Sequence, residues 1–418
     1  KASHDSLTGL LNRDQFYEDV HDMVNKYHDT TFYLICSNIK DFKFINEIFG
    51  MEKGNQVLIK QAKLMASNPS ERTICARLMN DRFALCLPRE EFDEKRVADS
   101  IKELQREFSG NSFHLHTYMG VYEIRDRDEA VSIMVDKANI AADTIKNNYD
   151  CCVAYYDEHL LEISIEQRRL LGEFEPALQK DEFVMYLQPQ VNRDGAAKGA
   201  EALVRWVHPS RGILTPYAFI DILENAGLIY KLDLYIWEKA AQKLVEWKEK
   251  GYGSYHISVN ISTKDFYIID IYETFTGLIN KYGIAASNLH LEITETTLMT
   301  DFEKNMNIIH KLQGVGFRVE IDDFGSGYSS LNMLKDISAD VLKIDMGFLR
   351  KSENEVKGQD ILESIIALAG KIGMDVITEG VETKKQLDML TMMGCHEFQG
   401  YYFSKPVPVS EFEEKYLV

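Results

Sequence analysis

Acidic residues stand at the ends of short apolar segments in the second half of the chain. In "VEIDDFGSGYSSL" the adjacent Asp322 and Asp323 end an apolar run and precede a loop with two glycines. Other polar residues interrupt the apolar segments "HISVNIS", "HLEITE" and "VLKIDM". A single acidic pair is most often solvated surface. Whether Asp322 and Asp323 have a chemical role therefore depends on whether the other polar residues lie close to them in the fold.

The polar residues that interrupt these segments form one set of carboxylates, amides and a single lysine. Its members are Glu201, Asn260, Glu292, Glu295, Asp322, Asp323, Lys343, Glu379 and Gln399. Converging carboxylates repel one another unless cations lie among them. Because the set offers hard oxygen ligands and contains no Cys or His, it favours Mg²⁺ or Mn²⁺ over zinc. The alternative, polar groups that satisfy one another inside a core, explains one or two members.

The elements that must position this set are strands. From about residue 183, short β-rich runs alternate with amphipathic segments such as residues 361–372, which is typical of parallel βα units. The runs are residues 183–191, 199–208, 255–262, 289–295, 317–324, 340–346, 375–381 and 395–403. Eight such runs predict an α/β protein with a TIM-like (β/α)₈ barrel, in which strand ends meet at one functional face. The first two runs are separated by a short turn around residues 192–195, so we expect them to pair antiparallel.

The first 155 or so residues have a different pattern. Apolar residues at helical spacing predict a helix over residues 16–28. Strand-like runs follow at residues 31–39, 73–78, 82–87 and 113–124, with a hairpin at residues 79–81. This pattern predicts a smaller α/β domain. The charged stretch of residues 157–179 is expected to be a helical connector.

Composition limits the classes of function. The chain of 418 residues has 47 Lys and Arg against 66 Asp and Glu, a net charge of −19, which argues against binding of a nucleic-acid polymer. The six cysteines show no disulfide or zinc spacing, so we expect a reduced, cytoplasmic setting. No apolar run reaches the roughly 18 residues of a membrane span. The chain begins at Lys1 without methionine, which leaves room for an upstream sensor or membrane segment.

The second half resembles a known family over about residues 164–418. Its segments "AEALVRWVHP", "SVNIS", "LEITE", "IDDFGSGYSS", "LKID", "ITEGVE" and "QGYYFSKP" resemble, in order and spacing, the EAL-domain cyclic di-GMP phosphodiesterases. The resemblance implies that one or two metal ions are held by Glu201, Asn260, Glu292, Asp322, Asp323 and Glu379. By the same resemblance, Lys343 and Gln399 position and activate the attacking water, and Glu295 anchors the loop after Asp323, in which Gly325 and Gly327 permit a tight turn. Gln188 and Arg205 resemble substrate contacts.

The first part resembles the GGDEF domains that make cyclic di-GMP from GTP. The resemblance rests on "DSLTGLLNR", "DFKFINEIFG" and "RLMNDRFALCLP" and spans roughly residues 1–155. Where the family signature reads Gly-Gly-Asp-Glu-Phe, this chain has Met79, Asn80, Asp81, Arg82 and Phe83. Glycines there let the backbone approach the guanine base, and the side chains of Met79 and Asn80 fill that space.

Other functional positions of the GGDEF pattern are also changed. Asn38 and Lys40 stand at acidic metal-binding positions, and Asp143 stands where a lysine contacts phosphate. The product-inhibition motif is replaced by residues 70–73. Asp81, Asn46 and Lys43 are kept, so weak GTP binding stays open, although a turn and a solvated lysine also explain the last two. We expect no cyclase activity.

These inferences predict a tandem protein with a degenerate GGDEF domain over residues 1–156, a helical connector over 157–175 and an EAL domain over 164–418. The expected reaction is metal-dependent hydrolysis of cyclic di-GMP to linear pGpG, with the front domain as a regulatory module and a homodimer formed through the EAL domain. One alternative is a cyclic di-GMP receptor without turnover. Receptors of this type usually lose metal carboxylates or the lysine, and this chain keeps them. A further alternative is a front domain that binds GTP and tunes the barrel.

Overall fold

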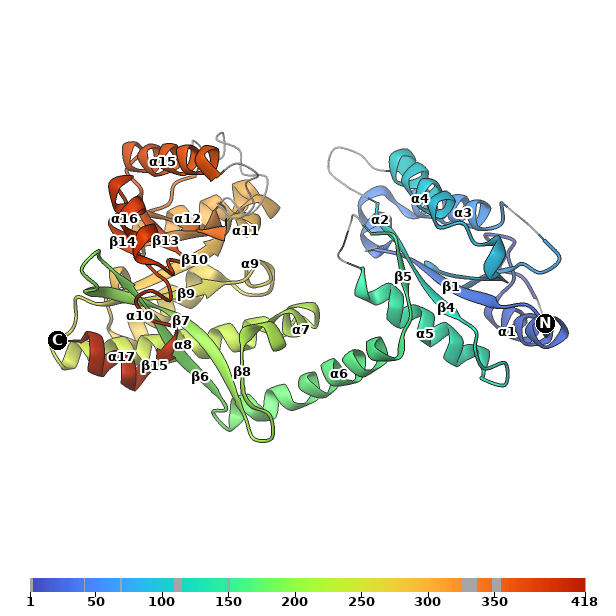
Figure 1. The fold of residues 1–418 in the computed structure, drawn as a ribbon, viewed down its shortest axis with the longest axis horizontal. Coiled ribbons are helices and arrows are strands. Elements are labelled where there is room, and N and C mark those ends of the chain that lie inside the picture. The colour runs from blue at the N-terminus through green and yellow to red at the C-terminus, as the bar shows by residue number, and fades with distance from the viewer. Residues whose placement is uncertain are drawn as a thin grey trace. The chain divides into compact units, whose positions relative to one another are not determined.

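The computed structural model describes residues 3–40, 42–67, 70–108, 115–146, 148, 151–324, 337–347 and 355–417. The chain divides into two compact units, Lys1–Arg168 and Arg169–Val418. Each unit has its own hydrophobic core, and Figure 1 shows the elements of both.

The front unit is built on a five-stranded sheet with the strand order β2-β3-β1-β4-β5. All neighbours are antiparallel except β4 and β5, which are parallel. The strands are β1 (Phe32–Ile39), β2 (Ile74–Met79), β3 (Arg82–Pro88), β4 (Thr117–Glu123) and β5 (Val153–Tyr155). The helices are α1 (Arg13–Lys26), α2 (Phe42–Phe49), α3 (Met51–Met65), the 3₁₀ turn η1 (Arg89–Glu91), α4 (Glu94–Phe108) and α5 (Val131–Thr144).

Helix α1 shows why the local sequence folds as predicted. The side chain of Asn12 caps the helix by accepting a hydrogen bond from Gln15 N at 3.0 Å, which satisfies one of the free N–H groups of the first turn. Phe16, Val20 and Val24 recur at helical spacing and are buried against the sheet. The predicted helix and the hairpin between β2 and β3 are therefore confirmed. The predicted strand over residues 113–124 is observed from Thr117, and its first two residues lie outside the described part of the chain.

The charged stretch after the front sheet is one helix, α6 (Glu158–Gln179). Most of its residues are partly or fully exposed, and Leu170, Phe174 and Ala177 near its end are buried. The helix thus joins the core of the second unit through its last turns, and its expected helical character is confirmed.

The second unit is a closed barrel of eight strands. Its strands are β6 (Phe183–Val191), β7 (Ala197–His208), β9 (His256–Ile261), β10 (Leu289–Thr294), β11 (Val319–Phe324), β12 (Val341–Asp345), β13 (Asp375–Glu379) and β14 (Glu397–Phe398). They follow one another around the barrel as β6-β7-β9-β10-β11-β12-β13-β14, and β14 pairs with β6 to close it. The β6–β7 pair is antiparallel, whereas the steps from β7 to β14 are parallel. The predicted fold class, including the antiparallel first strand, is confirmed.

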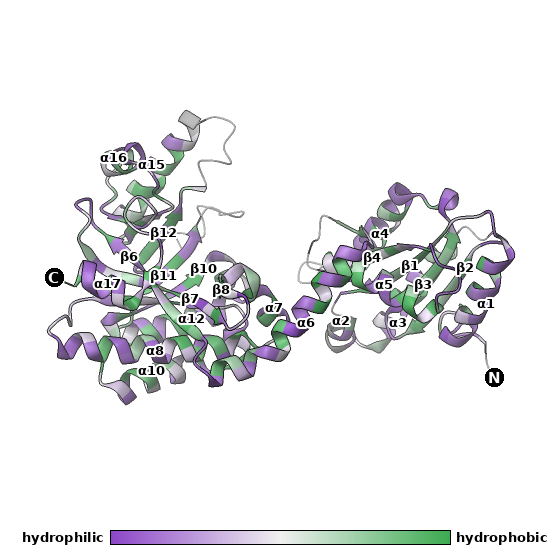
Figure 2. Ribbon diagram, turned by 60° about the horizontal axis from the view of Figure 1, so that its bottom comes forward, coloured by the Kyte–Doolittle hydropathy of each residue, from purple (hydrophilic) through white to green (hydrophobic). Residues whose placement is uncertain are grey.

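Helices cover the outside of the barrel (Figure 1). They are α7 (Ile220–Asn225), α8 (Ile229–Glu249), α9 (Asp265–Ile268), α10 (Ile271–Tyr282), α11 (Glu295–Thr300), α12 (Phe302–Val315), α15 (Glu355–Lys371), α16 (Lys384–Met392) and α17 (Val409–Tyr416), with 3₁₀ turns η2 (Pro216–Ala218) and η3 (Ala286–Asn288). Helix α8 buries Leu232, Ile236, Ala240 and Leu244 on one face, and each large aliphatic side chain contributes roughly 1.5–3 kcal/mol on burial. Figure 2 shows hydrophobic colours on many barrel strands and mixed colours along the covering helices.

Several strand limits differ from the sequence prediction. The last predicted run, residues 395–403, pairs in the barrel only over β14, because the chain turns after Gln399. The short strands β8 (Gly212–Leu214) and β15 (Val407–Pro408) were not predicted; they pair with β7 and β6, respectively. Both differences lie at the margins of the barrel.

No helix in the described ranges combines the length and the apolar character that a membrane crossing requires.

Candidate active site

The predicted polar set lies toward the carboxyl ends of the parallel strands. Glu292 of β10 is level with Asn260 of β9, and Asp322 of β11 is level with Thr294 of β10. On the antiparallel strand β6, Gln188 is level with Glu201 of β7. The strand register therefore brings residues from distant parts of the sequence to one end of the barrel, as expected for this fold.

Lys343 lies at the centre of the set and is fully buried. Its Nζ is 2.8 Å from Glu292 Oε2 and 2.8 Å from Glu379 Oε1. It is also 3.2 Å from Asp322 Oδ1 and 3.5 Å from Glu201 Oε2. One ammonium group thus contacts four carboxylates that come from four different strands.

The charges in this cluster are not balanced by the protein alone. Burial by itself would lower the pKa of Lys343, but the four carboxylates hold the pKa well above its ordinary value. Burial, and next the charge of Glu201, raise the pKa of Glu292 well above its ordinary value. Within the described residues, the buried Glu292 Oε1 has no hydrogen-bond partner. This excess of negative charge and the unpartnered oxygen fit an additional cation at the site.

Asp322 and Asp323 reach the same site because the strand is irregular where they stand. In a regular strand, neighbouring side chains point to opposite faces. The pairing of β11 with β12 shifts register between Ile321 and Phe324, and Asp323 has a left-handed backbone with φ of 55°. A bulge of this kind redirects a side chain. As a result, Asp322, Asp323 and Glu379 each offer a carboxylate oxygen within 4.8 Å of the others, a group that could hold a metal ion.

Glu201 is held by two amide side chains. Asn260 Nδ2 donates to Glu201 Oε1 at 3.0 Å, and Gln399 Nε2 donates to Glu201 Oε2 at 2.6 Å. Gln399 is fixed in turn by its backbone, whose N–H donates to Thr378 O at 2.9 Å. The next residue is Gly400, where an added Cβ would lie 2.3 Å from Val381 O. Only glycine permits this close approach between the chain just after β14 and the chain just after β13.

The two predicted substrate contacts lie beside this cluster. Gln188 Oε1 accepts a hydrogen bond from Gln399 Nε2 at 3.3 Å, which links it to Glu201. Arg205 lies further along β7, is partly exposed, and stacks over the ring of Tyr186 at 5.4 Å. Its Nη1 donates to the carbonyl oxygen of Val204 at 2.8 Å. Arg205 therefore contacts none of the carboxylates by a hydrogen bond or an ion pair among the described residues.

Glu295 is the first residue of α11, directly after β10, and is buried. Its expected partner is the loop that follows Asp323 and contains Gly325 and Gly327. That loop lies outside the described residues, so the role of Glu295 stays a prediction.

Sequence reasoning missed Asp345 at this end of the barrel. Asp345 is level with Glu379 in the pairing of β12 with β13, and its Oδ1 accepts a hydrogen bond from Gly347 N at 2.7 Å. A signal was present in the sequence, because Asp345 follows Lys343 by two residues and alternate residues of a strand share a face.

In the front unit, Met79 and Asn80 lie at the hairpin turn between β2 and β3. Asn80 takes a left-handed backbone with φ of 52° at the hairpin turn, and Met79 is exposed. Asn80 thus adopts the left-handed backbone conformation that glycine favours, but this turn carries the side chains of Met79 and Asn80. Burial, and next the charge of Asp143, raise the pKa of Tyr118 to about 12, and Asn38 hydrogen-bonds to the same tyrosine. An acidic side chain, Asp143, therefore lies near the strand end that carries Asn38.

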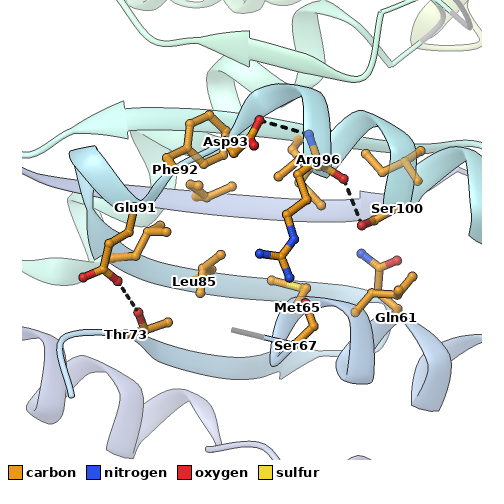
Figure 3. Close-up of a pocket in the computed structure, with 16 residues that line it drawn as sticks. Gln61, Met65, Ser67, Thr73, Leu85, Glu91, Phe92, Asp93, Arg96 and Ser100 are labelled. Atoms are coloured by element: carbon orange, nitrogen blue, oxygen red, sulfur yellow. Dashed lines mark hydrogen bonds between the residues drawn. The ribbon is translucent and has the colours of Figure 1, made fainter. Parts of the chain in front are cut away.

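Residues 70–73 contact a carboxylate of their own unit. Glu91 accepts hydrogen bonds from Ser70 Oγ at 2.8 Å and Thr73 Oγ1 at 3.3 Å, and it pairs with Arg72 at 3.0 Å. Glu91 and Thr73 border a small pocket of about 90 Å³, lined mostly by apolar side chains of α3, α4 and the sheet (Figure 3).

The fold and the site together define a class of protein: a TIM-like barrel with an acidic centre at the carboxyl ends of its strands, preceded by an α/β domain. Comparison with known families identifies both parts. The EAL domain matches residues 172–406, and the family described as diguanylate cyclase, GGDEF domain, matches residues 2–150. The chain belongs to the EAL family and carries a GGDEF domain in front of its EAL domain.

Curated relatives have the same tandem arrangement over this region. The chain is 30% identical to the bifunctional diguanylate cyclase/cyclic di-GMP phosphodiesterase MucR of Pseudomonas aeruginosa, over 98% of this chain and 61% of MucR. It is 29% identical to the cyclic di-GMP phosphodiesterase NbdA of the same organism, over 99% of this chain and 54% of NbdA. The Escherichia coli cyclic di-GMP phosphodiesterase PdeR is 26% identical over 99% of this chain and 63% of PdeR. The chain thus spans between half and two thirds of these relatives.

Solved structures agree with the fold. A structure of the MucR phosphodiesterase in complex with cyclic di-GMP has 33% identity and a TM-score of 0.56, covering 58% of this chain and 99% of that chain. The Vibrio cholerae LapD S helix-GGDEF-EAL structure, bound to cyclic di-GMP, covers 96% of this chain and 95% of that chain, with 18% identity and a TM-score of 0.58. At that identity, the LapD structure supports the fold alone.

Proposed function

We propose that the EAL barrel hydrolyses cyclic di-GMP to linear pGpG with the help of one or two Mg²⁺ or Mn²⁺ ions. The observation that carries the proposal is the group formed by Asp322, Asp323 and Glu379, whose carboxylate oxygens lie within 4.8 Å of one another, beside the buried Lys343. Relatives named as cyclic di-GMP phosphodiesterases support the choice of substrate.

The chain's own residues have separate tasks in this proposal. Glu201, Asn260, Glu292, Asp322, Asp323 and Glu379 hold the metal. A bound divalent ion lowers the pKa of a water molecule and stabilises charge on the leaving oxygen. Lys343 and Gln399 orient the attacking water toward phosphorus. The water gives up a proton as its oxygen forms a new bond to phosphorus, the opposite P–O bond breaks, and the released oxygen takes up a proton to become a hydroxyl group.

Substrate binding must overcome the negative charge of the site. Cyclic di-GMP carries two anionic phosphodiester groups, and the centre already holds several carboxylates. Arg205 can offer a planar, bidentate donor to a phosphate, and its partial exposure and place along β7 from Glu201 suit that task. Gln188, which is linked to Glu201 through Gln399, would orient the ligand.

Product separation tests the proposal. Purified protein is incubated with cyclic di-GMP and Mg²⁺ or Mn²⁺, and the nucleotides are separated by chromatography. Conversion to linear pGpG is the expected result. The second candidate, a receptor without turnover, is favoured if cyclic di-GMP binds and is recovered unchanged.

The front domain is proposed to be a regulatory module without cyclase activity. We expect that GTP and Mg²⁺ yield no cyclic di-GMP, even in a Glu201→Ala variant that cannot degrade the product. The physical reasons are the side chains of Met79 and Asn80 in the signature turn and the loss of an acidic metal ligand at Asn38. The measurement is chromatography of the GTP reaction over time. Accumulation of cyclic di-GMP in that variant would show that the front domain is an active cyclase.

A further inference from the structure

A second polar cluster lies inside the barrel, below the proposed active site. His256 is the first residue of β9, His290 is the second residue of β10 and Glu320 is the second residue of β11. These three strands are adjacent and parallel. Because parallel strands begin at the same end of the barrel, the three side chains lie toward the amino-terminal end, opposite the proposed catalytic centre.

The three side chains are packed closely together. The imidazole rings of His256 and His290 stack with centroids 3.8 Å apart and an angle of 4° between their planes. His290 Nδ1 is 2.6 Å from Glu320 Oε1. One nitrogen of each histidine and one oxygen of Glu320 lie within 4.8 Å of one another, a group that could hold a metal ion.

Neighbouring residues shape this cluster. An added Cβ at Gly199 of β7 would lie 2.4 Å from His256 Nε2, so the glycine leaves the space that the imidazole fills. His256 Nε2 is 2.7 Å from Gln190 Oε1 of β6. Burial lowers the pKa of His256 to about 3, so its ring is neutral at physiological pH, the form in which histidine binds metals.

Two buried polar atoms next to the rings are left without a partner. Glu320 is fully buried, and its Oε2 has no hydrogen-bond partner among the described residues. The same holds for Nε2 of Gln190, which is 1% exposed. Buried polar atoms are nearly always satisfied by protein, water or an ion. The unpartnered carboxylate oxygen is therefore an independent sign that a further group binds here.

A cavity connects the cluster to the outside. It has a volume of about 570 Å³, and His256, His290 and Glu320 line it. At its rim Lys198 pairs with Glu397, and Arg318 pairs with Asp375. Each cation of the rim therefore already has a carboxylate partner, whereas Glu320, whose Oε1 contacts His290, keeps within the described ranges an unpartnered Oε2 at a cavity wide enough for a hydrated ion.

We propose that His256, His290 and Glu320 form a second metal site, at the amino-terminal end of the barrel, that takes a borderline divalent cation such as Zn²⁺. Two imidazoles and a carboxylate are typical zinc ligands, whereas Mg²⁺ prefers oxygen ligands alone. Binding requires the stacked rings to turn so that their nitrogens converge, and the cavity gives room for this movement and for water as a further ligand. The ion ties together three strands whose other ends carry Asn260, Glu292 and Asp322.

Zinc binding to the whole chain tests this site. Calorimetry is carried out in excess Mg²⁺ with the Asp322→Asn/Asp323→Asn variant from which zinc has been removed, so that added zinc does not occupy the proposed catalytic centre. We expect one equivalent of zinc to bind and the unfolding temperature to rise, since an ion that binds only the folded chain stabilises it. His256→Gln and Glu320→Gln in the same background should each weaken zinc binding at least about tenfold. His310→Gln, which removes an exposed histidine of α12, should leave it unchanged.

A further variant keeps all three ligands. Gly199→Ala adds a methyl group where the His256 ring lies, and it should also weaken zinc binding. Absence of zinc binding to the parent background would show that the cluster is only a hydrogen-bonded polar core. Zinc that binds equally well to His256→Gln, Glu320→Gln and Gly199→Ala would place the ion elsewhere and overturn the proposal.

Discussion

Asp322→Asn is expected to lower kcat/KM for cyclic di-GMP by on the order of a thousandfold or more, which corresponds to about 4 kcal/mol of transition-state stabilisation. Asp322 contacts Lys343 at 3.2 Å and belongs to the metal-binding group with Asp323 and Glu379. Its replacement by an amide removes a charged ligand while it keeps the size of the side chain. Turnover and Mn²⁺ binding, measured on the same preparation, should fall together.

The stability of this variant separates a lost ligand from a damaged fold. Asp322 is one of several carboxylates that repel one another, and Lys343 keeps Glu201, Glu292 and Glu379 as partners. Asp322→Asn should therefore unfold no earlier than the parent protein in the absence of metal. Asp360→Asn, a matched change at an exposed position of α15, should keep full activity. Full activity of Asp322→Asn would rule out its proposed role as a metal ligand.

Lys343→Ala is expected to lower turnover by roughly two orders of magnitude or more, a loss typical of a group that positions water or transfers a proton. Affinity for cyclic di-GMP should change far less, because the metal and Arg205 are proposed to carry most of the binding. Lys343→Met, which fills more of the buried volume, should behave in the same way. Turnover assays and calorimetry with cyclic di-GMP measure the two quantities separately.

The contacts of Lys343 also allow a different role, in which it only balances the charge of the carboxylates. Its Nζ contacts four carboxylates and is fully buried, so it could be no more than a counter-ion. In that case a variant with bound Mg²⁺ would hydrolyse cyclic di-GMP normally, since the metal would replace the missing charge. Lys384→Ala, which removes an exposed lysine of α16, is the control and should change neither turnover nor binding.

Much of the candidate site could be predicted from the sequence because strand periodicity is simple. Asn260, Glu292 and Glu379 interrupt apolar strands near their carboxyl ends, and a parallel barrel must bring such ends together. The closed barrel and the antiparallel first pair also follow from the spacing of apolar runs and from one short turn. These features depend on local patterns that a single sequence displays.

Other features depend on geometry that no local pattern shows. By strand alternation Asp323 should point away from Asp322, and only the bulge with its left-handed backbone brings both into one group. The polar layer with His256, His290 and Glu320 was also missed. Each of these residues precedes a proposed metal ligand by two or four positions. Because alternate residues of a strand share a face, this spacing predicts that they point into the barrel, as the proposed ligands do. Their mutual contacts, however, depend on the register between strands.

Metal-dependent turnover is the measurement that tests the central proposal most directly. Purified protein is assayed with cyclic di-GMP after treatment with a chelator, and again after addition of Mg²⁺, Mn²⁺ or Ca²⁺, with pGpG as the quantified product. We expect that chelation abolishes turnover, that Mg²⁺ or Mn²⁺ restores it, and that Ca²⁺ inhibits it because its larger and looser coordination places the water poorly. Turnover that continues unchanged in the chelator would contradict the metal mechanism.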